Sequence, residues 1–229
     1  MNAFWLLENI DVTHLLCPTK LGNDEHMSHV THQTFKKGNP VYVPAEMADR
    51  IFFISEGKVK IASMNDEGKE ITKAILGKGE VFGENALLGE GQRRDFATAL
   101  EDTTACVVTL DELRSLMRER SELNLFFMRM FGARQLDMER RLESLVFRDS
   151  RSRIVEFFYN RVLQKGERVG YEWVLRNFIT HQEIANLTAT SRQTVTTTLN
   201  DLRAKKLLTF NRSRLLVRDM DKLAAEIRH

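Results

Sequence analysis

The sequence predicts an α+β protein with a β-rich N-terminal half, one long helix, and a C-terminal part of short helices and hairpins. Three observations lead to this fold class. Short apolar-rich segments follow one another between residues 30 and 110, a heptad pattern runs through residues 121–147, and two short helical patterns precede a basic hairpin in residues 180–218. A change from many short strands to helical periodicity indicates separate structural units along the chain.

Length and composition suit two small domains or one large domain with ordinary cores, since the 229 residues are 42% hydrophobic and include only 3 prolines. No run approaches the roughly 18 apolar residues of a membrane span. Residues 1–16 are apolar but carry acids and no basic start, so they predict a short amphipathic helix rather than a signal peptide. These features predict a cytoplasmic protein that does not contact a membrane.

Cysteine and histidine usage predicts no metal or haem. Cys17 and Cys106 lie far apart without a CxxC motif, whereas a cluster held by thiolates alone usually needs four, so both are expected to be apolar fillers. His26, His29 and His32 recur at a spacing of three, which on a helix would group imidazoles as a metal site does. Because this segment leads into a strand and lacks a suitably spaced carboxylate or thiol, we expect a solvated loop instead.

Charge is distributed unevenly along the chain. From residue 149 onward there are 15 basic and 9 acidic residues, whereas the first 148 residues hold 19 and 23. An acidic N-terminal part and a basic C-terminal part predict that only the C-terminal part binds a polyanion such as nucleic acid.

The β-rich half is predicted from four apolar, β-branched or aromatic segments, at residues 41–44, 50–64, 71–82 and 104–110. Turn signals separate them, such as KKGNP at residues 36–40 and NDEGKE at residues 65–70. Many short strands at this spacing are typical of an antiparallel barrel or sandwich.

Residues 121–147 predict one long helix, because they contain no proline and a single glycine. A seam with alternating steps of three and four runs along it: Met128, Phe131, Gln135, Met138, Leu142 and Leu145. Other apolar residues lie on different faces, namely Leu123, Phe126, Phe127 and Met130. Apolar residues on two faces are explained better if one face packs on the β-rich half and the other on a partner chain than if the helix packs within one domain alone. We therefore predict a homodimer, with Gln135 fixing the register.

Residues 150–165 predict an amphipathic helix and residues 166–178 a short hairpin. Next, Thr180 and Glu183 form a capping box that starts a helix, and Ser191 caps a second helix with Val195, Leu199 and Leu202 as its buried stripe. Two short helices joined by a short turn make a helix-turn-helix, whose second helix lies in the major groove of DNA.

Burial of that stripe turns Arg192, Gln193, Thr196 and Thr197 outward. Gln193 can pair with adenine N6 and N7, Arg192 with guanine or a phosphate, and the two threonines with a thymine methyl or a phosphate. Four more residues sit near helix starts, where hydroxyl and amide groups meet phosphates: Thr180, Gln182, Ser191 and Thr194. The alternative for this surface is a solvated helix face.

A basic hairpin after the second helix favours the DNA reading. Residues 204–218 contain no acid and five of the chain's basic residues: Lys205, Lys206, Arg212, Arg214 and Arg218. Residues 209–217 predict a hairpin with its tip at 211–213, a wing placed to meet phosphates or the minor groove of double-stranded DNA.

Residues 79–99 (GEVFGENALLGEGQRRDFATA) combine the residue types that a ribose and a phosphate need. Glu84 can accept from a ribose hydroxyl, Arg93 and Arg94 can meet a phosphate, and Gly83 lets backbone amides approach. The alternative is a turn in which Glu84 and Arg94 pair with each other.

Taken together, the chain from about residue 35 to 218 resembles the CRP/FNR family of bacterial transcription regulators. The resemblance rests on FKKG, IFFISEGKVKI, GEVFGE, the arginine pair, the long helix, QEIANL and SRQTV. It implies a jelly-roll β-roll of the cyclic-nucleotide-binding type in residues 1–120, a dimerisation helix in 121–148 and a winged helix-turn-helix in 149–229. It also implies homodimers that bind near-palindromic DNA and contact RNA polymerase, with Gly83, Glu84 and Arg94 at the positions that hold cyclic AMP in some members.

Departures from the members that bind cyclic AMP make that nucleotide the less favoured effector. Asp95 replaces a small hydroxyl residue beside the phosphate, and a carboxylate about 5 Å away costs about 3 kcal/mol at an effective dielectric near 20. Met138 and Glu139 replace the adjacent Thr and Ser that bind adenine. The effector is thus open: another anion, cyclic AMP, or none with a degenerate pocket.

Ala189 stands in the turn where the family often has glycine with positive φ, which predicts a different turn or mild strain. No triad, P-loop or metal set occurs, so neither an enzyme nor a cyclic-nucleotide-regulated enzyme subunit is expected.

Overall fold

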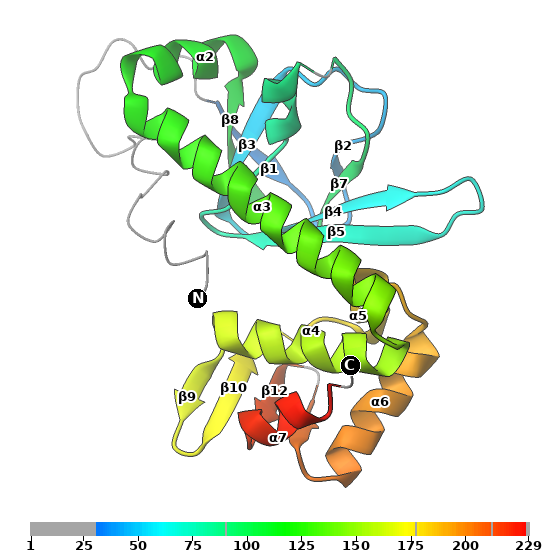
Figure 1. Cartoon of the computed structure of the whole chain (residues 1–229). Helices are drawn as coiled ribbons and strands as arrows, with labels where there is room; N and C mark the ends of the chain where they lie inside the picture. The colour runs from blue at the N-terminus through cyan, green and yellow to red at the C-terminus, as the bar shows by residue number, and fades with distance from the viewer. Residues whose placement is uncertain (1–30, 90, 177, 212, 228–229) are drawn as a thin grey trace. The chain divides into compact units, whose positions relative to one another are not determined.

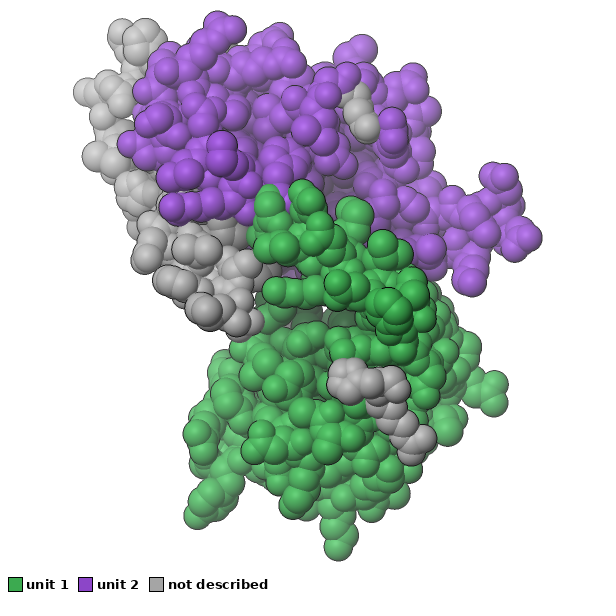
Figure 2. Space-filling view, in the orientation of Figure 1, with its two compact units in different colours: residues 1–4, 132–229 green, residues 5–131 purple. Residues whose placement is uncertain are grey.

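The computed structural model describes residues 31–89, 91–176, 178–211 and 213–227. Two compact units divide them, one ending at Phe131 and the other beginning at Gly132, and Figure 2 colours them separately. The amphipathic helix predicted for residues 1–16, together with Cys17, His26 and His29, lies outside the described residues. The division into segments 1–120, 121–148 and 149–229 stays a prediction.

The N-terminal unit is built on two four-stranded antiparallel sheets, which confirms the predicted β-roll (Figure 1). One has the order β1-β8-β3-β6, with β1 Thr31–Phe35, β8 Thr103–Thr109, β3 Arg50–Glu56 and β6 Val81–Phe82. The other has the order β2-β7-β4-β5, with β2 Pro40–Tyr42, β7 Phe96–Ala99, β4 Lys58–Met64 and β5 Glu70–Gly77. Short strands rich in β-branched and aromatic residues, broken by Gly-containing turns, produce this arrangement.

Side chains from both sheets fill the roll interior, since alternate residues of a strand point to opposite faces. Phe52 and Phe82 stack with their ring centroids 4.8 Å apart, and Tyr42 packs against both. Cys106 is fully buried in a hydrophobic cluster of this unit, as expected of an apolar filler. Its Sγ lies 3.3 Å from Nε2 of His32, which is on the exposed first strand.

Three elements of the roll were not predicted as strands or helices from the sequence. Strand β7 lies in a segment assigned only to a ligand turn, and η3 Glu84–Leu88 forms a 3₁₀ turn between two left-handed glycines. Helix α2 Leu110–Glu119 follows β8 directly, with Thr109 and Glu112 forming a capping box.

Helix α3 Ser121–Phe147 is continuous over 27 residues, as predicted. Its first turns pack on the roll through the four buried residues assigned to that face: Leu123, Phe126, Phe127 and Met130. Phe131 of the predicted seam is partly buried against the same cluster. Met128, Met138, Leu142 and Leu145 are exposed in the single chain.

From residue 150 onward, the described part of the C-terminal unit contains four helices and one four-stranded antiparallel sheet. The helices are α4 Ser150–Lys165, α5 His181–Thr188, α6 Arg192–Ala204 and α7 Met220–Ala225. The sheet has the order β11-β12-β10-β9, with β11 Leu208–Phe210, β12 Arg214–Val217, β10 Glu172–Arg176 and β9 Glu167–Val169. The two predicted hairpins are confirmed, whereas α7 was not predicted.

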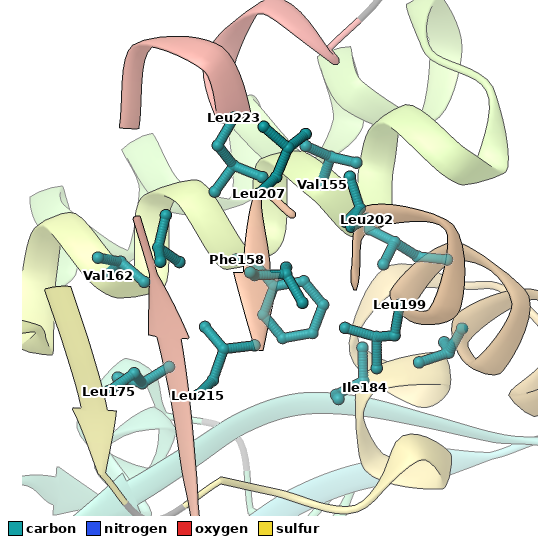
Figure 3. Close-up of a cluster of buried hydrophobic side chains, with 14 of the residues drawn as sticks. Val155, Phe158, Val162, Leu175, Ile184, Leu199, Leu202, Leu207, Leu215 and Leu223 are labelled. Carbon is teal, nitrogen blue, oxygen red and sulfur yellow. The ribbon is translucent and has the colours of Figure 1, made fainter. Parts of the chain in front are cut away.

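Figure 3 shows the core of this unit, in which Phe158 of α4 lies among side chains from the sheet and from both helices of the helix-turn-helix. Val195, Leu199 and Leu202 are fully buried, so the stripe predicted for the second helix is confirmed. Their burial fixes which face of α6 remains outside.

Candidate nucleic-acid interface and roll interior

Helix α5 begins with the predicted capping box. Thr180 Oγ1 accepts from the Glu183 amide at 3.2 Å, and Glu183 Oε2 accepts from the Thr180 amide at 2.7 Å. Thr180 and Gln182 are both exposed at this helix start, and Gln182 donates to Asn186 at 2.9 Å. The amides of the first turn point out of the helix, where a phosphate can reach them.

The turn between α5 and α6 keeps the left-handed conformation with an alanine. Ala189 has φ 50° and ψ 48°, so the mild strain expected of this residue is present while the turn geometry is retained. Arg153 of α4 supports it by donating to the carbonyls of Thr188 at 3.0 Å and Ala189 at 3.1 Å. These bonds satisfy carbonyls at the end of α5.

Helix α6 presents three of its predicted base-reading residues to solvent. Ser191 caps the helix by accepting from the Thr194 amide at 3.0 Å. Arg192, Gln193 and Thr197 are all exposed, and Gln193 and Thr197 lie on the face opposite the buried stripe. A long polar side chain near the start of a recognition helix is in position for the major groove.

Two predicted hydroxyl residues are less available than the sequence suggests. Thr196 is half-buried and donates to the Arg192 carbonyl at 2.9 Å, and its oxygen lies 2.9 Å from His181 Nδ1. The hydroxyl has one proton, so Nδ1–H of His181 donates to it. Thr194 is also half-buried and shares a 2.8 Å hydrogen bond with Ser191.

His181 also belongs to this surface, although no sequence pattern predicted it. Its ring packs edge-on against Phe178 and at 5.9 Å from Phe210, while Nδ1 reaches α6. Burial lowers the pKa of His181 from its ordinary value, and the nearby Arg192 charge lowers it further, which favours the neutral ring. The neutral His181 ring of α5 therefore connects to α6 by a hydrogen bond and to β11 by packing on Phe210.

A charged network ties the other end of α6 to α4 and to the chain after α7. Arg151 donates to Asp201 at 2.8 Å and also to Glu226, and Lys205 reaches Glu226 at 2.9 Å. The hydrogen bond from Arg151 lowers the pKa of Asp201. A network of partly exposed charges holds the recognition helix more firmly than an isolated surface pair does.

The predicted wing is a tight hairpin, and its lysine and arginine side chains differ in whether they already pair with an acidic residue. Asn211 Oδ1 accepts from the amides of Ser213 at 2.9 Å and Arg214 at 3.0 Å, which fixes the turn. Lys205 belongs to the network above, and Arg218 pairs with Glu172 at 3.2 Å. Lys206 and Arg214 are exposed, whereas Arg212 lies outside the described residues.

In the roll, Gly83 is required by its surroundings. It has φ 79°, and a Cβ there would lie 3.0 Å from Nη1 of Arg93 and 3.1 Å from the Arg50 carbonyl. Both the left-handed backbone and the close approach disfavour a side chain at this position. Glu84, which follows it, is buried at 7% exposure.

The two neighbouring arginines point to opposite sides. Arg93 is buried, donates from Nη1 to the Gly83 carbonyl at 2.9 Å and from Nη2 to the Arg50 carbonyl, and lies 4.4 Å from the centre of the Tyr42 ring. Burial lowers its pKa from the ordinary arginine value. Arg94 is exposed and lines a shallow hollow with Gly91, Gln92 and Arg93.

Asp95 points inward beside Arg93, and Lys73 offsets its charge. The carboxylate accepts from Lys73 Nζ at 2.9 Å and from the Tyr42 hydroxyl at 3.2 Å. No sequence pattern connected Asp95 with a cation on another strand, and the structure supplies one in Lys73. The predicted repulsion of a phosphate is correspondingly smaller.

Within the described ranges, no group of three or more His, Cys, Asp or Glu side chains could hold a metal ion. Over the same part of the chain, no helix is both long and apolar enough to cross a membrane.

The fold and site define a regulator class with a cyclic-nucleotide-binding type of roll and a winged DNA-binding domain. The family profile "Cyclic nucleotide-binding domain" matches residues 32–120, and the profile "Crp-like helix-turn-helix domain" matches residues 152–226. The chain is 31% identical to the Global nitrogen regulator of Synechococcus elongatus, over 81% of this chain and 84% of that protein. It is 30% identical to the Cyclic AMP receptor protein of Thermus thermophilus, over 82% and 83% respectively.

Among solved structures, a CooA mutant from Carboxydothermus hydrogenoformans has a TM-score of 0.79 and 25% identity, covering 100% of this chain and 96% of that one. The chain belongs to the CRP/FNR family of DNA-binding transcription regulators. The resemblance stated from the sequence, the predicted fold class and the regulator function are thereby confirmed.

Proposed function

We propose that the protein acts as a regulator, not as an enzyme, by reading a specific DNA sequence with α6. The observation that carries this is the exposed face of α6, where Arg192, Gln193 and Thr197 stand clear of a fully buried stripe on a capped, braced helix. Gln193 offers both a donor and an acceptor for one adenine, and Arg192 offers donors for guanine or a phosphate.

The polar residues at the starts of α5 and α6 are proposed to bind DNA phosphates and so to fix the position of α6 along the DNA. They are Thr180, Gln182, Ser191 and Thr194. Thr196 is proposed to act chiefly through its bonds to His181 and the Arg192 carbonyl, leaving its methyl group for base contact.

The protein is proposed to work as a homodimer through the exposed stripe of α3. Met138 and Leu142 are 70% and 62% exposed in the single chain, which is costly for apolar side chains in water. Two-fold symmetry would then place two α6 helices in successive major grooves, about 34 Å apart. Family membership further supports contact with RNA polymerase and action in the cytoplasm.

Replacing Gln193 by Ala is expected to lower affinity by about 1–3 kcal/mol at one base pair of each half-site and to relax specificity there. The glutamine side chain is exposed, so stability should not change. Fluorescence anisotropy with a panel of single-base variants of the preferred site measures this. A uniform loss on every sequence would show that Gln193 contacts only the backbone.

For the roll, we propose an anionic effector that meets Arg94, with Gly83 and Glu84 shaping the site and Arg93 holding the turn from inside. What supports this is the exposure of Arg94 at a shallow hollow beside the internally bonded Arg93. Cyclic AMP is one candidate anion, still the less favoured because Met138 and Glu139 do not suit adenine. Titration calorimetry of Arg94→Ala against the wild type, with cyclic AMP and cyclic GMP as probes, tests the assignment; a binding heat in the wild type that Arg94→Ala keeps unchanged would refute the role of Arg94.

A further inference from the structure

Two arginines stand directly opposite each other on neighbouring strands of the C-terminal sheet. Arg176 is the last residue of β10 and Arg214 the first of β12, and the strand register pairs them. Both are exposed. Like charges in facing positions of an antiparallel pair destabilise a sheet, so the pair has no structural benefit of its own.

The two arginines line a shallow hollow together with Asn211 and Ser213 at the tip of the wing. Asn211 accepts from the Ser213 and Arg214 amides, and Ser213 Oγ donates to the same oxygen at 3.0 Å. The rim of the hollow is thus a closed turn whose hydroxyl proton is already used. The charged donors that line the hollow are those of the two guanidinium groups.

Glu167 pairs with Arg176 and neutralises the two arginines only weakly. Arg176 Nε meets Glu167 at 3.0 Å, with both side chains more than half exposed. An exposed ion pair of this kind contributes about 0–1 kcal/mol. A guanidinium has five donors, so most of those of Arg176 stay available.

The hollow is held in one rigid assembly with the DNA-reading helices. The Phe178 amide, three residues before the start of α5, donates to the Ser213 carbonyl at 3.3 Å. The Phe178 ring packs on Phe210 of the wing and on His181, and His181 reaches Thr196 of α6. The wing tip, the start of α5 and the recognition helix therefore keep fixed positions relative to one another.

We propose that Arg176 and Arg214 together hold one backbone phosphate of the DNA beside the bases read by α6. This rests on the proposed DNA-binding function and adds a binding site on strands outside the helix-turn-helix. Two planar forks facing one hollow match the geometry of a phosphate, which explains why two like charges are placed side by side. The contact is independent of base sequence and anchors the outer end of each half-site.

The test is the double variant Arg176→Gln/Arg214→Gln in the full-length dimer. Affinity for the preferred site and for unrelated DNA should fall by a similar factor, on the order of 10-fold. The slope of log K against log salt should become shallower by about 2 per dimer, because each lost phosphate contact contributes about 0.9. Arg176→Lys/Arg214→Lys, which keeps charge but not the forks, should lie between the double Gln variant and the wild type.

The matched control is Arg168→Gln/Lys222→Gln, which removes the same charge from exposed positions on β9 and α7 and should leave the slope near wild type. Equal slope changes in the two double Gln variants would overturn the proposal, since net charge alone would then explain the loss. A loss confined to one base pair would overturn it too. If the wild type itself bound no DNA, the proposed function would fail instead, which separates the two ideas.

Discussion

Replacing Leu142 by Glu is expected to turn the dimer into a monomer at micromolar concentration and to weaken binding to a two-fold-symmetric DNA site by about 10²–10⁴-fold. Leu142 lies on the exposed apolar stripe of α3 with Met138 and Leu145. Two-fold symmetry would bring two new carboxylates into one apolar seam, where an unpaired charge is strongly disfavoured. A monomer contacts only one half-site, so it loses the gain in affinity that comes from binding two linked half-sites at once.

Analytical ultracentrifugation and fluorescence anisotropy measure the two effects. The control is Leu136→Glu, an exposed leucine of the same helix that lies about a third of a turn off the seam. This control should remain dimeric and bind DNA. A Leu142→Glu protein that stays folded and dimeric would contradict the assignment of α3 as the dimer helix.

Replacing Arg93 by Ala is expected to destabilise the β-roll by about 3–5 kcal/mol. The change removes the side-chain donor of the Arg50 carbonyl, a loss worth about 1–3 kcal/mol in the interior, while the Gly83 carbonyl keeps the Ala86 amide at 3.2 Å. It also removes a cation from the face of Tyr42, worth about 2 kcal/mol when desolvated. Hydrogen exchange of the β3 and β8 amides at increasing urea concentration reports the unfolding of this unit by itself.

Arg94→Ala is the matched control, because it deletes the same side chain one residue away at an exposed position. Its free energy of unfolding should stay within about 0.5 kcal/mol of wild type. If Arg93→Ala cost no more stability than Arg94→Ala, the internal role of Arg93 would be wrong.

Local sequence patterns were sufficient to predict the elements whose caps and buried faces depend only on neighbouring residues in the chain. The capping box at Thr180, the cap at Ser191 and the buried stripe of α6 each depend on neighbours in the chain, and all three are confirmed. The face of α3 that meets the roll followed from its apolar excess beyond the seam. Helix α7 was missed because only 6 residues, with a single buried leucine, give little periodicity.

The roll interior shows what such signals leave undetermined. Arg93 and Arg94 are the same residue type, and only the direction of the backbone before β7 decides that Arg93 and Asp95 point inward. The partner of Asp95, Lys73, comes from β5, 22 residues away, and no local pattern connects them. His181 was overlooked for a similar reason, since its partners Thr196 and Phe210 meet it only in the folded unit.

Selection of binding sites from random double-stranded DNA tests the central claim, that this protein reads a specific sequence as a two-fold dimer, most directly. The purified full-length protein, without and with cyclic nucleotide, is predicted to enrich a near-palindromic site whose half-sites are one helical turn apart. Enrichment of no sequence under either condition, or of a single asymmetric half-site alone, would contradict the account.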